Sequence, residues 1–226
     1  MSDIEAMLRA FTDDVASARS SRFLFRTIGA VGSESPEILS ALNQSPMTWR
    51  TILHSLQTTT YVAIGCLFDR DARSVSVHRL LEVCSANPEF FSMSGLLERK
   101  VTEGLPRKLA TDYVAAAYEP IASDFEDLLP EADKWRNVFV EKYMPVRHKL
   151  VAHTDVDHID QADLLVAQTN VGELEEMLDF AHSVERFVWE LAQNGHKYDL
   201  GHFDHRDEVW LANEATKLLR SLVPGE

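Results

Sequence analysis

The strongest constraint on the fold is a run of apolar residues at helical spacing near the C-terminal end of the chain. Between Asn170 and Gly195, apolar residues recur three or four positions apart, which places them on one face of an α-helix. They are Leu174, Met177, Leu178, Ala181, Val184, Val188 and Leu191. Asn170 followed by Glu173 resembles a capping box at a helix start, and Gly195 is a typical helix end. A helix with one such apolar face must pack against other helices.

Two more segments show the same spacing, each behind its own start signal. Ser45 followed by Pro46 predicts a helix start, because serine caps free N–H groups and proline suits the first turn. The apolar stripe that follows comprises Ile52, Leu53, Leu56, Thr60, Ala63, Ile64 and Leu67. Ser74 or Ser76 predicts the next helix start, and the inward residues behind it are Val77, Leu80, Leu81 and Cys84. We therefore expect an all-α protein.

The remaining segments predict the architecture around these helices. Further helices are expected over residues 3 to 30, with breaks near Gly29 and Gly32, from Pro36 to about Asn43, over residues 108 to 128, bent at Pro120, and over residues 204 to 222. Residues 88 to 106 hold two prolines and two glycines and predict a loop with room for a helical turn. The prediction is an up-and-down helical bundle over residues 1–195 with an irregular insertion, followed by a C-terminal helical appendage over residues 196–226.

Composition and charge exclude several function classes. With 36 acidic against 22 basic residues the net charge is −14, so a broad basic surface that grips nucleic acid is not expected, nor is DNA as a partner. A local basic site, or a basic site completed by two subunits, is not excluded by the net charge.

The glycine and proline content bears on the fold class. The 9 glycines and 8 prolines are too few for a β-sandwich of many short strands and tight turns.

The cysteines and the N-terminal segment bear on the compartment. Cys66 and Cys84 lie 18 positions apart in apolar helical patterns and have no C-x-x-C partners, which is typical of buried thiols in a reducing cytosol. The N-terminal segment is amphipathic and of mixed charge, unlike a signal peptide, and no apolar run reaches the length of a membrane span. We expect a cytoplasmic protein with no membrane partner.

One segment joins an arginine to a histidine at the end of a helical pattern. Arg147 and His153 are six positions apart, so they lie roughly 120° apart around a helix axis and flank a shared groove. The apolar stripe that leads into His153 at helical spacing comprises Phe139, Tyr143, Val146 and Leu150. His153 is therefore expected to face either the bundle core or a subunit interface. Pro145 predicts a break just before the pair: the helix kinks there, or a new helix begins and places Arg147 in a first turn, where free N–H groups favour anions.

The pair has the residue types needed for RNA cleavage without a metal. Such cleavage needs a base that takes the 2′-OH proton and an acid that protonates the leaving 5′-oxygen, and an imidazole serves in either role near neutral pH. A guanidinium can hold the non-bridging phosphate oxygens. Two copies facing each other across a two-fold axis supply two of each group. In the structural alternative, His153 is a core or helix-cap residue whose ring nitrogens are hydrogen-bonded within the fold, and Arg147 forms an ion pair with a nearby acidic side chain.

These residues resemble a known family. The string Arg147-His148-Lys149-Leu150-Val151-Ala152-His153-Thr154-Asp155 matches the R-x4–6-H motif of the HEPN superfamily and is similar to the R-N/H-K-x-x-A-H-x-D form of its abortive-infection, AbiU-like branch. The segments from Leu67 to Asp71, from Ser74 to Ser76 and from Thr169 to Leu174 resemble the same branch. The resemblance covers roughly residues 5 to 195, and the rest of the chain beyond residue 195 lies outside it.

The resemblance implies a metal-independent endoribonuclease that dimerises, so that two motifs form one cleft, and that serves as a toxin or in phage defence. It implies that His153 is the general acid/base, that Arg147 stabilises the phosphate, that His148 supports the site, and that Asp155 orients His153 or caps the helix end. RNA is the implied substrate, no metal or cofactor is implied, and an antitoxin partner is left open. Some toxins of the superfamily carry, two positions after the histidine, a tyrosine that a nucleotidyltransferase antitoxin modifies; Asp155 stands there, so such silencing is not expected.

Two other charged clusters offer alternatives. Residues 153 to 160 hold a dense set of metal-ligand types, but Ile159 fills the third ligand position of an EF-hand loop and no glycine follows, so we favour an acidic loop. The residues of that set are His153, Asp155, Asp157, His158 and Asp160. Asp69, Arg70, Asp71 and Arg73 alternate in charge and are expected to form local ion pairs, or else to lie near the motif. The alternative to a ribonuclease is a non-catalytic helical interaction or nucleotide-binding module of the same fold.

Overall fold

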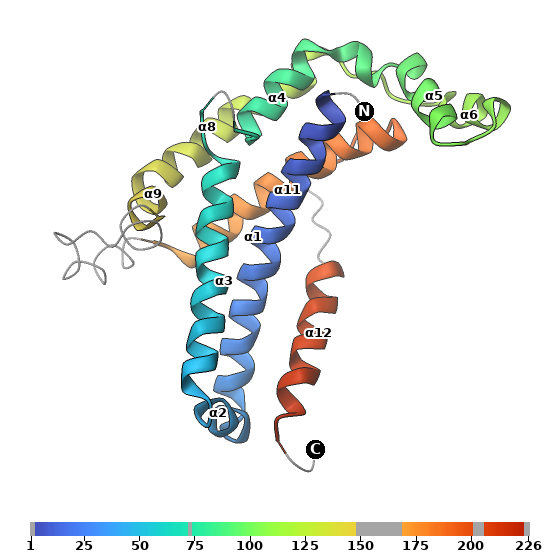
Figure 1. Ribbon diagram of the computed structural model, residues 1–226. Coiled ribbons are helices and arrows are strands. Elements are labelled where there is room, and N and C mark those ends of the chain that lie inside the picture. The colour runs from blue at the N-terminus through green and yellow to red at the C-terminus, as the bar shows by residue number, and fades with distance from the viewer. Residues whose placement is uncertain (1–2, 72–73, 148–168, 201–205, 224–226) are drawn as a thin grey trace.

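The computed structural model describes residues 3–71, 74–147, 169–200 and 206–223, and every regular element in these ranges is a helix (Figure 1). The elements are α1 (Asp3–Glu34), α2 (Pro36–Asn43), α3 (Pro46–Leu67), α4 (Val77–Ala86), η1 (Pro88–Phe91), α5 (Met93–Thr102), α6 (Arg107–Val114), α7 (Ala122–Glu126), α8 (Leu129–Val138), η2 (Phe139–Tyr143), α9 (Met144–Val146), α11 (Val171–Asn194) and α12 (Arg206–Arg220). The predicted all-α class is confirmed. No helix of the described ranges is long and apolar enough to cross a membrane.

The long helices α1 and α3 run side by side in opposite directions, and α2 joins them at one end (Figure 1). α2 has the predicted bounds, and α3 begins at Pro46 as predicted, although the Ser45 side chain makes no capping bond. α1 continues unbroken to Glu34, so the expected breaks near Gly29 and Gly32 are absent. Each helical glycine costs about 1 kcal/mol. The burial of Ile28 beside Leu219 and the α2 side chains outweighs that cost, since a buried side chain of this size contributes about 1.5–3 kcal/mol.

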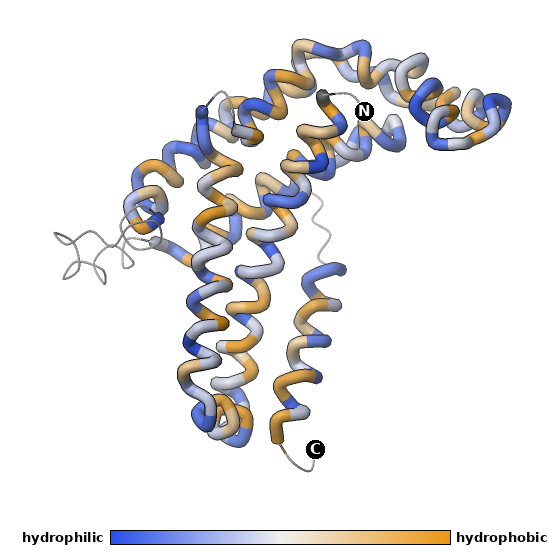
Figure 2. The backbone as a smooth tube through the Cα atoms, viewed as in Figure 1, coloured by the Kyte–Doolittle hydropathy of each residue, from blue (hydrophilic) through white to orange (hydrophobic). Residues whose placement is uncertain are grey.

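The main core lies where α11 and the helices around α4 and α8 pack against the α1–α3 pair. The predicted stripe of α11 is buried along its whole length, as are the four inward residues of α4. Large side chains with almost no exposure fill the space between them: Phe11, Phe68, Phe91, Phe125, Tyr143, Ile64, Leu67, Leu80, Leu81, Met177 and Leu191. Figure 2 shows the apolar positions recurring at intervals along each helix, which is the pattern that the sequence predicts.

Residues 88–128 differ from their prediction. The expected loop contains the ten-residue helix α5, because the Ser92 hydroxyl accepts the Gly95 N–H at 3.1 Å and caps its start. The expected helix over residues 108 to 128 is wrong: α6 ends at Val114 and α7 begins only at Ala122. Between them the Tyr118 N–H donates to the carbonyl of Gly195 at 2.7 Å, so the chain leaves the helix to reach the end of α11. α5 and α6 extend beyond α4, away from the α1–α3 pair (Figure 1).

The C-terminal helix α12 lies beside α1 (Figure 1). It buries Ala215 and Leu219, and Leu219 joins the smaller core formed by α1, α2 and α3. α11 ends at Gly195, whose φ of 63° is the left-handed conformation that glycine adopts without strain, as predicted. The helix predicted near residues 204–222 is therefore present, whereas the division of the chain at residue 195 stays a prediction.

Candidate functional site

The predicted site falls partly within the described ranges. Arg147 is the last described residue before the gap, whereas His148, His153 and Asp155 lie outside the described residues. The acidic set from residue 153 to 160 also lies outside them. Among the described residues, no group of three or more His, Cys, Asp or Glu side chains could hold a metal ion. Of the predicted site residues, Arg147 alone lies within the described ranges, together with the side chains around it.

The helix that leads to Arg147 widens into the π-helical turn η2, which ends two residues before Pro145. At its end the Met144 N–H bonds to the carbonyl of Phe139, five residues back. Proline supplies no N–H and its ring crowds the preceding turn, and a wider turn gives that ring room. The predicted break thus takes the form of a widened turn, and the backbone stays helical up to Arg147. π-turns inside α-helices are frequent at functional sites.

The apolar stripe predicted along this helix is confirmed as far as the structure describes it. Phe139, Tyr143 and Val146 are 3%, 0% and 2% exposed. Its predicted continuation, Leu150 and then His153, lies outside the described residues. The stripe holds the end of the helix, and with it the backbone of Arg147, firmly against the core.

The side chain of Arg147 lies against Gly65, in the last turns of α3. A Cβ atom on Gly65 would come within 2.6 Å of both Cζ and Nε of Arg147, and within 2.7 Å of its Cδ. The guanidinium group therefore occupies the space that any other residue at position 65 would fill. Arg147 is half-buried, yet no acidic side chain in the described ranges forms an ion pair with it. The structural alternative, an arginine neutralised by a nearby acid, finds no partner in that part of the chain.

Charges of both signs lie within electrostatic range of the neighbouring Cys66. Burial raises the pKa of the Cys66 thiol, and the carboxylates of Asp14 and Asp69 raise it further, while the positive charge of Arg147 acts in the opposite direction. Burial, together with Asp13, also raises the pKa of Asp14. Cys66 is thus a thiol whose ionisation depends on the position of the Arg147 guanidinium.

Tyr143 joins the π-helical turn η2 to the start of α11. Its hydroxyl donates to the Asn170 carbonyl at 2.7 Å and accepts the Asn170 N–H at 3.3 Å. Its ring centroid lies 6.4 Å from that of Tyr61, one helical turn before Gly65 in α3. Burial raises the pKa of Tyr143 to about 12, so its hydroxyl keeps its proton. The chain therefore enters and leaves the segment 148–168 at one place, beside the last turns of α3.

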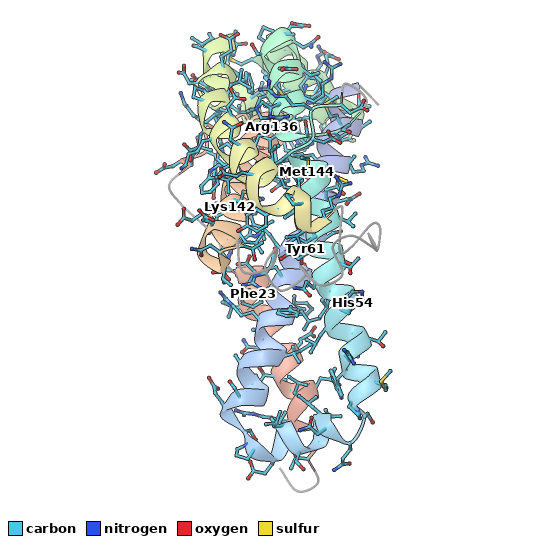
Figure 3. All side chains as sticks on the ribbon, turned by 90° about the vertical axis from the view of Figure 1, so that its left-hand side faces the viewer. Phe23, His54, Tyr61, Arg136, Lys142 and Met144 are labelled. Atoms are coloured by element: carbon cyan, nitrogen blue, oxygen red, sulfur yellow. The ribbon has the colours of Figure 1, made fainter. Side chains whose placement is uncertain are left out.

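A salt bridge reinforces this junction. Lys142 donates to Glu173 across a distance of 2.6 Å. The Asn170 side chain accepts the N–H groups of Gly172 and Glu173 at 2.8 and 3.4 Å, which confirms it as the cap of α11. The Glu173 carboxylate pairs with Lys142, so the reciprocal half of the predicted capping box is replaced by a tertiary contact. Figure 3 shows Lys142, Met144 and Tyr61 on one face of the molecule, with Phe23 of α1 below them.

The charged residues after α3 differ in part from the prediction of local ion pairs. Arg70 pairs with Asp133 of α8, whose Oδ1 also lies 3.0 Å from Nε2 of His78. Asp69 instead accepts the N–H of Asp71 at 3.0 Å, which is a local contact. Burial lowers the pKa of His78, while the hydrogen bond to Asp133 opposes that shift. The cluster ties the α3–α4 connection to α8 and so supports the helix that leads to Arg147.

Two features of this site are absent from the predictions. One is Gly65, although a single glycine inside an apolar helical pattern is a signal for a close approach of another group. The other is the bond between the Tyr143 hydroxyl and Asn170, for which the sequence carries no signal.

A comparison with protein families finds a match over residues 1–209 to the HEPN family described as AbiU2. Neither the comparison with curated proteins nor that with solved structures finds a match. The family match covers the main core, the junction at Tyr143 and the motif segment from Arg147 to Asp155.

Proposed function

The chain belongs to the AbiU2 family of HEPN proteins, and on this premise we propose that it is a metal-independent endoribonuclease of the abortive-infection type. Its substrate is RNA, it acts in the cytoplasm as a homodimer, and an antitoxin partner is left open. The catalytic groups are Arg147 and His153, with His148 and Asp155 in support.

In this proposal, the RNA 2′-oxygen attacks the adjacent phosphorus and the bond to the 5′-oxygen breaks. A His153 imidazole takes the proton of the 2′-OH group, and the His153 of the second subunit gives a proton to the leaving 5′-oxygen. Arg147 holds the non-bridging oxygens, on which negative charge grows in the transition state. The products are a 2′,3′-cyclic phosphate and a 5′-OH end. No step requires a metal or a cofactor.

The observation that supports this proposal best is the state of Arg147. Its guanidinium lies beside Gly65 and forms no ion pair with a described acidic residue. Among the described residues no carboxylate takes up its donors, and a phosphate group offers oxygens in matching geometry. A local cationic site of this kind is compatible with the net charge of −14.

The test is RNA cleavage by purified protein with and without EDTA. We expect wild-type protein to cut RNA in both conditions, and Arg147→Ala or His153→Ala to abolish cleavage without loss of helical signal. Arg50→Ala and His54→Ala serve as matched controls, because both residues are exposed on α3. If wild-type protein cuts no cellular RNA pool, the proposed activity is wrong and the non-catalytic module is favoured.

A mixing experiment tests the shared cleft. Wild-type protein is mixed with an excess of His153→Ala subunits, which are inactive alone in this proposal. If one cleft takes its two histidines from both subunits, a mixed dimer has one histidine where the mechanism needs two, so the cleavage rate per wild-type subunit falls as the variant is added. If each chain holds its own complete site, the rate per wild-type subunit stays unchanged.

A further inference from the structure

We propose that Gly65 is a positioning residue for Arg147: the missing side chain at position 65 sets the place of the guanidinium that binds the RNA phosphate. The inference rests on the proposed function for its link to RNA. Its geometric part concerns only the α3–Arg147 contact and can be tested without RNA.

The distances determine which group must move when position 65 gains a methyl group. Contacts of 3.4–4 Å are ordinary for a Cβ atom, whereas the Cζ and Nε atoms of Arg147 lie 2.6 Å from that position, so they must shift by about 0.8–1.4 Å. The atoms in the way are those of the guanidinium end of a long flexible side chain, and the three nearest ones all belong to Arg147. Gly65→Ala is therefore expected to displace the guanidinium and leave the helix backbone in place.

Two contacts fix the rest of Arg147 while its guanidinium moves. Val146, the preceding residue, is 2% exposed, so the backbone is held in the core. Tyr143, one turn earlier, is held by Tyr61 and Asn170. Since the backbone at Arg147 cannot shift to compensate, the guanidinium group in Gly65→Ala lies away from its wild-type position. A misplacement of about 1 Å in a catalytic group can cost roughly 100-fold in rate.

Cys66 provides a reporter for the guanidinium that does not depend on RNA. The positive charge of Arg147 favours ionisation of the Cys66 thiol, and Cys84, the second cysteine, is fully buried. The thiol pKa is measured from the pH dependence of alkylation, with mass spectrometry to identify Cys66. The full-length chain is used as wild type, Gly65→Ala, Arg147→Gln and the double variant.

The prediction is a coupling between the two substitutions. Arg147→Gln raises the Cys66 pKa in the wild-type background, and it produces a clearly different shift in the Gly65→Ala background, because the guanidinium has already moved. Equal shifts in both backgrounds would overturn the inference, since the guanidinium then keeps its place beside an alanine. Gly29→Ala is the matched control, because no atom lies within 4 Å of its Cβ position and it adds the same methyl group to a helix.

RNA cleavage then tests the link to function. We expect Gly65→Ala to lower kcat by about 100-fold with an unfolding midpoint no lower than that of the wild-type protein, because alanine favours a helix more than glycine does. We expect Gly29→Ala to keep wild-type activity, and the double variant to be no slower than Arg147→Gln alone. Full activity of Gly65→Ala together with thiol coupling would overturn the positioning role. Absence of cleavage by wild-type protein would instead refute the proposed function, and the thiol measurement would still decide the geometric part.

Discussion

Replacing Tyr143 by phenylalanine removes the hydroxyl that joins the π-helical turn to the start of α11. In the wild-type protein this hydroxyl donates to the Asn170 carbonyl at 2.7 Å and accepts the Asn170 N–H at 3.3 Å. The aromatic ring and its contact with Tyr61 remain in the variant. The substitution therefore isolates the two hydrogen bonds that hold together the two ends of the segment 148–168.

The magnitude follows from these two bonds. A hydrogen bond contributes about 0.5–1.5 kcal/mol net, and a buried group left without a partner costs about 1–3 kcal/mol. Tyr143 is fully buried and its bonds to Asn170 are partly buried, so we expect Tyr143→Phe to lower the free energy of unfolding by about 2–3 kcal/mol. For a chain of this size each kcal/mol corresponds to about 2–4 °C in Tm, which gives a decrease of about 4–12 °C.

The assay is urea unfolding followed by circular dichroism, with the midpoint and slope compared between variants. Tyr113→Phe is the matched control: its hydroxyl donates to Asn194 at 2.8 Å, but the side chain is 45% exposed. We expect the control to change stability by less than about 0.5 kcal/mol. If both variants unfold at the wild-type midpoint, the Tyr143–Asn170 junction does not stabilise the fold.

The same junction predicts a pH dependence at alkaline pH. The pKa of Tyr143 is raised from 10.0 to about 12 by burial, so the neutral hydroxyl is the form that the fold favours. Its contribution to stability is present below pH 10 and is lost as the pH rises from 10 through 12. Wild-type stability should therefore fall more steeply than that of Tyr143→Phe over this range, and equal slopes contradict the burial of the phenol.

Three further predictions concern other parts of the fold. Gly195→Ala should lower the free energy of unfolding in urea by about 2–4 kcal/mol, because the φ of 63° strains alanine and its Cβ would lie 2.5 Å from that of Ala117. Gly104 has a φ of 101° but no atom within 4 Å of its Cβ position, so Gly104→Ala should lower it by only about 1–2 kcal/mol. Equal losses in the two variants would contradict the clash at Gly195. Burial lowers the pKa of His78, so its uncharged form stabilises the fold above pH 6.5, and the free energy of unfolding of the wild-type protein falls below that pH. The free energy of unfolding of His78→Gln should fall less between pH 7 and pH 5. The same pH dependence in both proteins would refute this. Asn170→Ala should lower stability by about 1 kcal/mol through loss of the α11 cap, and a wild-type Tm excludes that role.

The helices whose signals are local were predictable from the sequence. The stripe of α11 lies between a capping asparagine and a closing glycine, and α4 follows a capping serine, so spacing and caps give both helices. α1 was predicted with breaks that it does not have, because the burial of Ile28 and its neighbours outweighs the cost of two glycines. The end of α6 depends on the bond from Tyr118 to the Gly195 carbonyl, a contact between distant segments that no local pattern encodes.

The candidate site likewise combines local sequence features with contacts between segments that are distant in the sequence. The motif string predicts Arg147 and His153 as site residues, because the residue types and their spacing are local features. The contact of Arg147 with Gly65 depends on how the motif helix packs on α3, and the Tyr143–Asn170 bond depends on how it meets α11. These contacts decide where the guanidinium lies, and only the three-dimensional structure places them.

The most direct test of the proposed function is the chemistry of the RNA ends that purified protein produces in EDTA. Total cellular RNA is incubated with wild-type protein and with His153→Ala, and the product ends are identified by mass spectrometry. Attack by the 2′-oxygen predicts 2′,3′-cyclic phosphate and 5′-OH ends with the wild-type protein and none with His153→Ala. Products with 5′-phosphate and 3′-OH ends, cleavage that stops in EDTA, or cleavage that persists in His153→Ala would contradict the account.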